Sequence, residues 1–185
     1  MSQTNVRRTT LWLTKTALML AAAVTAQWAA VTLSGSNQLI VGSVVNFFLL
    51  FSCLLGGFWS AQAVACLTPC VGALVGLVPN PLLIPFVALS NAAMIGTFSL
   101  IWFAGQSPKG SKRILRLVAA LVPAVLVKYG AMVLCARVGF PLVGIAGPQL
   151  DKLTAMWGIT QMFTAAIGAG LALLAGLKKF PQYRR

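Results

Sequence analysis

The stretch LVAALVPAVLVKYGAMVLCA, residues 117–136, decides the class of this protein. An α-helix needs about twenty apolar residues to cross the hydrocarbon core of a bilayer, and this stretch has that length. Near its middle lies a single lysine, Lys128. A lysine in the centre of a membrane costs at least about 2.5 kcal/mol, which makes Lys128 a candidate functional residue. The surroundings of Lys128 have to be inferred from the other predicted spans.

Composition places the whole chain in the membrane class. Of its 185 residues, 59% are hydrophobic and only 8% are charged, whereas a soluble domain has about 25% charged residues. Helices and closed barrels are the structures that satisfy their backbone hydrogen bonds in lipid. Long apolar runs, rather than short alternating segments, indicate helices. We therefore expect one all-α integral membrane domain over residues 1–185.

Turn-forming residues divide the chain into six predicted transmembrane helices. The dividing segments are residues 34–37, 56–57, 79–81, 105–113 and 137–152, which are rich in Gly, Pro, Asn or Ser. The predicted spans are residues 11–33, 38–55, 59–78, 82–104, 114–136 and 153–177.

The basic residues orient the predicted bundle. The chain has 14 Lys and Arg residues and one acid, for a net charge of +13. Most of the basic residues lie before the first span, in the loop 105–113 and in the C-terminal tail, three regions that six spans put on one side. The positive-inside pattern then makes both termini cytoplasmic. We interpret the charge as contact with anionic membrane lipid and expect no nucleic-acid partner.

The sequence contains few residues that could act in catalysis. There is no His, Asp151 is the only acid, and none of the four cysteines forms a CxxC pair. Acid–base and nucleophilic mechanisms need such groups. The segment 105–112 has Gly-Ser-Lys where a P-loop needs Gly-Lys-Ser/Thr. We expect no catalytic residue, no cofactor and no metal site, and any use of ATP requires another subunit.

Five polar residues fall at similar depth in five predicted spans. At about 1.5 Å per residue, Gln27 and Lys128 lie about 24 and 21 Å from the cytoplasmic ends of their spans. Asn46, Asn91 and Gln161 lie about 12–14 Å from the outer ends of theirs. All five are thus in the middle or outer half of a core about 30 Å thick. We expect them to line a pocket that opens outward.

The surroundings of this predicted pocket follow from the same positions. Trp28, Trp157 and Tyr129 would form apolar walls, and the first outer loop, residues 34–38, would close over the pocket. A lysine with several amides suits a small polar solute, anionic or heterocyclic. Three alternatives stay open: buried amides also link helices by hydrogen bonds, a lysine can extend to the membrane surface, and the tryptophans fit an interfacial belt.

Small residues four positions apart occur on three predicted spans. Such spacings let helix backbones approach closely. They serve either packing within the bundle or docking to another membrane protein. The pairs are Ala17 with Ala21 and Ala22 with Ala26, Gly72 with Gly76, and Gly168, Ala172 and Gly176 in a row.

Three segments carry a resemblance to a known family: KTALMLAAA at 15–23, NQLIVGSVVN at 37–46 and LVPNPLLIPFVALSN at 77–91. With its size, six predicted spans and cytoplasmic termini, the chain resembles the substrate-binding S components of energy-coupling factor (ECF) transporters. These proteins import vitamins and related micronutrients into prokaryotic cells. The resemblance extends over nearly the whole chain.

The resemblance implies a function and partners. The protein would be a multi-pass subunit of a prokaryotic plasma membrane that binds a micronutrient from outside. It would dock through Ala17 and Ala21 on a transmembrane coupling subunit, and two cytoplasmic ATPases would drive inward release. The implied substrate-binding residues are Asn37, Asn91, Lys128, Trp157 and Gln161.

Two other functions stay open. One is a membrane scaffold or assembly subunit without transport activity, which buried amides with no outward cavity would favour. The other is a stand-alone transporter of small solutes, against which the lack of a clear inverted repeat argues. Pocket residues vary among S components, so the substrate does not transfer. Lys128 alone suggests a vitamin or precursor that carries a carboxylate or phosphate.

Overall fold

The structure, a computed structural model, describes residues 3–35, 37–77, 80–104 and 111–176. Within these ranges the chain forms helices and turns and no strand. The long helices are α1 (Gln3–Ser34), α2 (Gln38–Gly56), α3 (Phe58–Leu74), α4 (Ile84–Trp102), α5 (Ser111–Leu134) and α8 (Ile159–Gly176). The short elements are the 3-10 turn η1 (Pro81–Leu83), the π-helical turn η2 (Cys135–Gly139), α6 (Phe140–Leu142) and α7 (Pro148–Trp157).

Several of these helices are suited to a bilayer, as the apolar runs predict. In the described part of the chain, five segments are long and apolar enough to cross a membrane: Asn5–Ser34, Gln38–Gly56, Pro81–Trp102, Ser111–Leu142 and Pro148–Gly176. Helix α3 is apolar but shorter, with 17 residues. At 1.5 Å per residue it extends about 26 Å. The expectation of an all-helical chain with several long apolar helices is confirmed.

The helix ends use the turn residues that the sequence indicates. The Asn37 side chain caps α2 by accepting a 3.0 Å hydrogen bond from the Leu39 N–H. Asn80 caps η1 in the same way through the Leu82 N–H, also at 3.0 Å. Gly57 ends α2 with φ +82°, a left-handed conformation that favours glycine. These caps fix where α2 and the η1–α4 unit enter the bundle.

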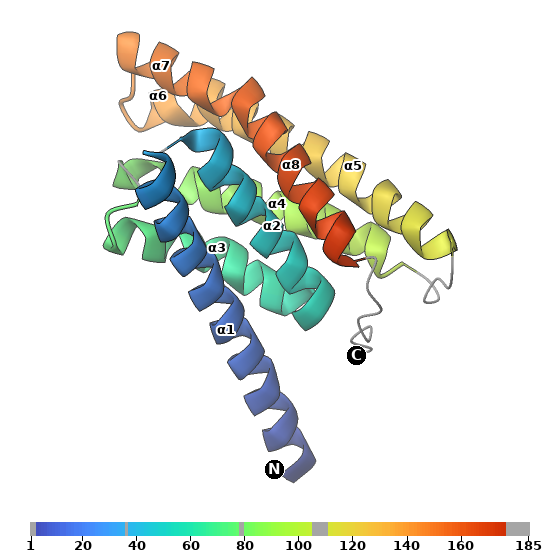
Figure 1. Cartoon of the computed structure of the whole chain (residues 1–185). Helices are drawn as coiled ribbons and strands as arrows, with labels where there is room; N and C mark the ends of the chain where they lie inside the picture. The colour runs from blue at the N-terminus through green and yellow to red at the C-terminus, as the bar shows by residue number, and fades with distance from the viewer. Residues whose placement is uncertain (1–2, 36, 78–79, 105–110, 177–185) are drawn as a thin grey trace.

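The long helices form one bundle in which α2 packs mainly on α8, and α4 on α5 (Figure 1). Helix α1 packs on α2 and α3 from Thr16 onward. Its N-terminal half projects away from the other helices. The helix begins at Gln3, eight residues before the predicted span, because polar residues 3–10 continue it. Outside the lipid, water hydrates these polar side chains, so they do not end the helix.

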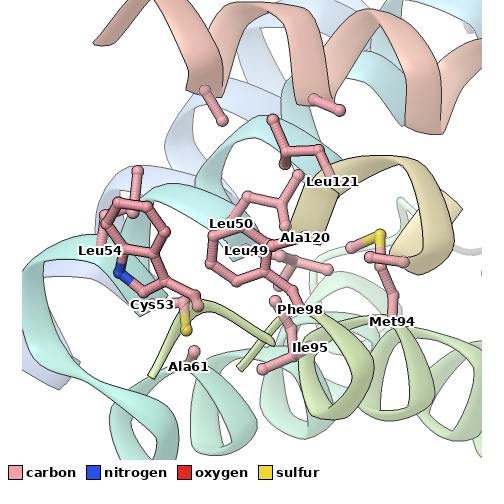
Figure 2. Close-up of a cluster of buried hydrophobic side chains, with 14 of the residues drawn as sticks. Leu49, Leu50, Cys53, Leu54, Ala61, Met94, Ile95, Phe98, Ala120 and Leu121 are labelled. Carbon is pink, nitrogen blue, oxygen red and sulfur yellow. The ribbon is translucent and has the colours of Figure 1, made fainter. Parts of the chain in front are cut away.

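The interior of the bundle is filled by large apolar side chains from α2, α3, α4 and α5 (Figure 2). Leu49, Leu50 and Phe98 are fully buried there, and the Phe98 and Trp102 rings stack with centroids 6.1 Å apart. A second apolar cluster lies at the α6–α7 end. In it the Phe140 ring meets the Trp157 ring edge-on at 5.4 Å.

The predicted last span, 153–177, is wrong as a single helix. Gly158 has ψ −113° and separates α7 from α8. Its N–H donates to the Thr154 carbonyl at 2.9 Å, and its carbonyl accepts from the Gln161 N–H at 3.1 Å. One glycine in an apolar run leaves the hydropathy pattern unchanged, so the pattern does not reveal the break. In addition, α7 begins at Pro148, within the predicted connection.

A second correction concerns the small-residue pair on α3. This helix ends at Leu74, and Gly76 follows it in a turn with φ +75°. Gly72 and Gly76 therefore do not form a GxxxG face on one helix. The row on α8 does lie on a buried face, since Gly168, Ala172 and Gly176 are all buried.

Candidate functional site

Lys128 lies on the inward face of α5 and is only 3% exposed. Its Nζ atom donates a 2.6 Å hydrogen bond to Oδ1 of Asn91 on α4. It donates another to Oδ1 of Asn46 on α2. Both asparagines are 1% exposed. Three helices thus meet at one buried ammonium group, as the depth count predicts.

The hydrogen bonds continue from Asn46 to α8. The Asn46 Nδ2 group donates to Thr164 Oγ1 at 3.3 Å. The Thr164 hydroxyl donates to the Gln161 carbonyl at 3.0 Å, and the Gln161 Oε1 atom lies 3.5 Å from the same hydroxyl. We call Lys128, Asn46, Asn91, Thr164 and Gln161 the Lys128 cluster. Its members come from α2, α4, α5 and α8.

Helices α2 and α8 are in close contact. A Cβ atom built on Gly168 would lie 2.6 Å from Asn46 Cβ and 2.8 Å from the Ser43 carbonyl oxygen. A Cβ atom on Gly42 would lie 2.8–2.9 Å from the Thr164 side chain. These distances are too short for any side chain, so both positions need glycine. Small residues at such crossings let membrane helices approach closely.

The Lys128 cluster contains donor groups that lack acceptors among the described residues. An ammonium group has three N–H donors, and Nζ has two acceptors among the described residues. The buried Nδ2 group of Asn91 has no hydrogen-bond partner there either. Buried polar groups without partners are rare in native proteins and call for an explanation. A further acceptor group would satisfy both atoms.

No acidic side chain neutralises Lys128 in the part of the chain that the structure describes. Asp151 is the only acidic residue in the sequence, and it is exposed in the first turn of α7. A buried charge without a counter-ion is strongly unfavourable. The Lys128 cluster is therefore the place in this bundle where an anion from outside would be most stabilising.

No protein-family model, curated protein or solved structure matches the chain. The resemblance to ECF S components therefore stays a prediction, and the function has to be argued from the site itself.

The structure places the other predicted pocket residues in different surroundings. Asn37 is the exposed cap of α2. Trp157 is buried in the second apolar cluster against Phe140 and forms no hydrogen bond with the Lys128 cluster among the described residues. Gln27 is buried on α1, and its Oε1 atom has no partner in the described ranges. Trp28 is 56% exposed, so it is no wall of an internal pocket.

Thr164 is the member of the Lys128 cluster that the sequence reasoning missed. It lies three residues after Gln161, one helical turn further along the same face of α8. A threonine in an apolar helix is unremarkable by composition. The i, i+3 spacing from Gln161 is the signal that could have identified it.

Other buried or half-buried polar groups link helices in pairs. The Thr16 hydroxyl on α1 donates to Ser60 Oγ on α3 at 2.9 Å. The Gln62 Nε2 group on α3 donates to the Ala92 carbonyl on α4 at 3.1 Å. Such links are the ordinary polar contacts between membrane helices. The Lys128 cluster differs because it joins four helices around a buried lysine amine.

The predicted docking residues lie on the outside of the bundle. Ala17 and Ala21 are exposed on α1, while Ala23 on the opposite side is fully buried. The exposed face of α1 also carries Thr14 and Thr25. Ala17 and Ala21 therefore take no part in packing this bundle, and a partner helix could approach them closely.

Proposed function

We propose that this protein is a solute-binding subunit of a membrane importer and that Lys128 is the anchor for an anionic solute. The observation that carries the proposal is a buried lysine amine, held by two amides from different helices, in a chain whose only acidic side chain is exposed elsewhere. A carboxylate or phosphate on the solute would supply the missing counter-charge.

The hydrogen-bonding capacity of the site supports an acceptor-rich ligand. The third donor of Lys128 and the Nδ2 group of Asn91 both need acceptor atoms. A carboxylate offers two oxygens with several lone pairs, which fits this need. None of the five members of the Lys128 cluster is a His, Cys or carboxylate that could perform chemistry on the solute. Its role is therefore recognition.

In the arrangement described, the Lys128 cluster is closed, because its members are almost fully buried. Solute entry requires the helices around it to separate. The break between α7 and α8 at Gly158 lies three residues before Gln161 and is a natural hinge. We infer that α8 moves relative to α2 and α5 when the solute enters.

The wider role follows the resemblance to ECF S components. The protein would bind a vitamin or related micronutrient with high affinity from outside a prokaryotic cell, with six spans and cytoplasmic termini. It would dock through Ala17 and Ala21 on a coupling subunit energised by two ATPases. The exposure of both alanines on a projecting helix supports this step.

A thermal-shift panel tests the binding proposal. The full chain, purified in detergent, is heated with vitamins and precursors that carry a carboxylate or phosphate, each beside its uncharged amide or alcohol. A bound ligand raises the melting temperature. We expect an acidic compound to stabilise the wild type and to leave Lys128→Met unchanged. Stabilisation by the uncharged partner alone, or equal stabilisation of both proteins, would contradict the proposal.

One observation favours a second candidate, a scaffold subunit without a ligand. The Lys128 cluster is closed, and its two hydrogen bonds to Asn46 and Asn91 would equally satisfy a neutral amine. Under that alternative Lys128 only joins helices. Lys128→Met would then change stability, and no acidic compound in the panel would shift the wild type.

A further inference from the structure

A surface groove of about 320 Å³ lies where two helical segments are interrupted. One wall comes from α5 and η2 and includes Tyr129, Val133 and Arg137. The other comes from α7 and the break before α8 and includes Thr154, Ala155 and Gly158. None of these residues belongs to the Lys128 cluster. The groove is therefore separate from the proposed solute site.

The helix irregularities explain why space is left between the walls. The π-helical turn η2 widens the last turns of α5, and Arg137 lies within it. Across the groove, Gly158 has no side chain and the backbone leaves the helical path. π-helical turns are rare and often occur at functional sites. Both walls thus depart from regular helix at the same place.

The groove combines one cation with an apolar surface. The Arg137 side chain is exposed and forms no ion pair in the part of the chain that the structure describes. Thr154 and Tyr129 add hydroxyl groups to the lining, and Val133 and Ala155 add apolar surface. A guanidinium group binds phosphate through paired N–H donors. An occupant that matches all of these groups has a phosphate and a hydrocarbon portion.

We propose that this groove binds one anionic phospholipid. Its phosphate would lie on Arg137 and Thr154, and an acyl chain would lie along Val133. Both walls belong to segments long and apolar enough to cross a bilayer, Ser111–Leu142 and Pro148–Gly176. Lipid is the molecule that surrounds such segments. Basic pockets between membrane helices are known lipid headgroup sites.

Native mass spectrometry of the full chain in detergent tests the proposal. Phosphatidylglycerol is added in one titration and phosphatidylcholine, which has no net charge, in another. We expect the wild type to bind phosphatidylglycerol preferentially, and Arg137→Gln to weaken that binding about tenfold, the effect of losing one strong charge-assisted contact. Lys152→Gln is the matched control, since Lys152 is an exposed cation on α7 outside the groove.

A second variant guards against a folding defect in Arg137→Gln. Ala155→Trp fills the groove without changing its charge and should remove the bound lipid, whereas Ala166→Trp, exposed on α8 away from the groove, should not. Phosphatidylglycerol binding that is as tight in folded Arg137→Gln as in the wild type, or that is retained in folded Ala155→Trp, would overturn the proposal. So would equal binding of the two lipids by the wild type.

Discussion

Lys128 on α5 donates a 2.6 Å hydrogen bond to the amide oxygen of Asn91 on α4. The Asn91 oxygen therefore helps to stabilise the Lys128 amine inside an apolar bundle. Its own Nδ2 group meanwhile has no partner in the described ranges. The pair is both a link between two helices and an incomplete binding site, and separate experiments address these two properties.

The link between the helices predicts energetic coupling. Asn91→Leu removes one acceptor of Lys128 and should destabilise the protein by about 1–3 kcal/mol. Lys128→Met in the same chain should restore much of this loss, because no buried donor is then left unpaired. A double-mutant cycle on unfolding in mixed micelles measures the coupling. Additive effects of the two substitutions would show that the contact has no energetic weight.

Thr164 should matter through its hydroxyl group. Thr164→Val keeps the shape of the side chain but leaves Nδ2 of Asn46 without its acceptor. We expect a loss of about 1–3 kcal/mol in the free energy of unfolding. Thr164→Ser retains the hydroxyl and is the control, with a smaller loss. If valine and serine are equally destabilising, packing rather than hydrogen bonding is the role of Thr164.

The close approach of α2 and α8 predicts a difference between two glycines on one helix. Gly168→Ala places a Cβ atom 2.6–2.8 Å from atoms of α2, and such overpacking costs about 1–3 kcal/mol. Gly170→Ala meets no atom within 4 Å and should be neutral or stabilising by up to about 1 kcal/mol. Thermal unfolding of both variants checks this. Equal stabilities would contradict the tight α2–α8 contact.

The docking proposal predicts that bulk on α1 separates the protein from its partners. Ala21→Trp should abolish co-purification with membrane ATPase subunits from the native host, since a large side chain keeps a partner helix away. Leu33→Trp is the control, because Leu33 is exposed near the end of the same helix. Both variants should keep the wild-type melting temperature. ATPase subunits retained equally by Ala21→Trp would argue against docking at this face.

The part of the fold that sequence reasoning predicted well depends on strong local signals. Asn37, Gly57 and Asn80 lie at helix ends and fix those ends by capping or by a left-handed backbone. Depth along each predicted span brought Lys128, Asn46 and Asn91 to one level, and burial drives polar groups at one level towards each other. These inferences need only helix geometry and the length of a membrane span.

The features that the sequence did not predict depend on tertiary packing. The break at Gly158 and the π-helical turn at Cys135–Gly139 leave no mark in an apolar run. Gln27 lies at the right depth, yet it forms no hydrogen bond with the Lys128 cluster in the described ranges, because depth does not say which way α1 is rotated. Depth likewise does not say that Trp157 faces Phe140 rather than the Lys128 cluster. Rotation about each helix axis is set by its neighbours.

The most direct test of the central claim, that Lys128 holds an anionic solute, is mass spectrometry of small molecules released from the purified full chain. Wild type, Lys128→Met and the surface control Lys152→Met are expressed in the same host, purified in the same detergent and denatured to release what they carry. We expect one acidic compound, near one per protein, in the wild type and in Lys152→Met, and its loss from Lys128→Met. The same compound retained by all three proteins, or none in the wild type, would contradict it.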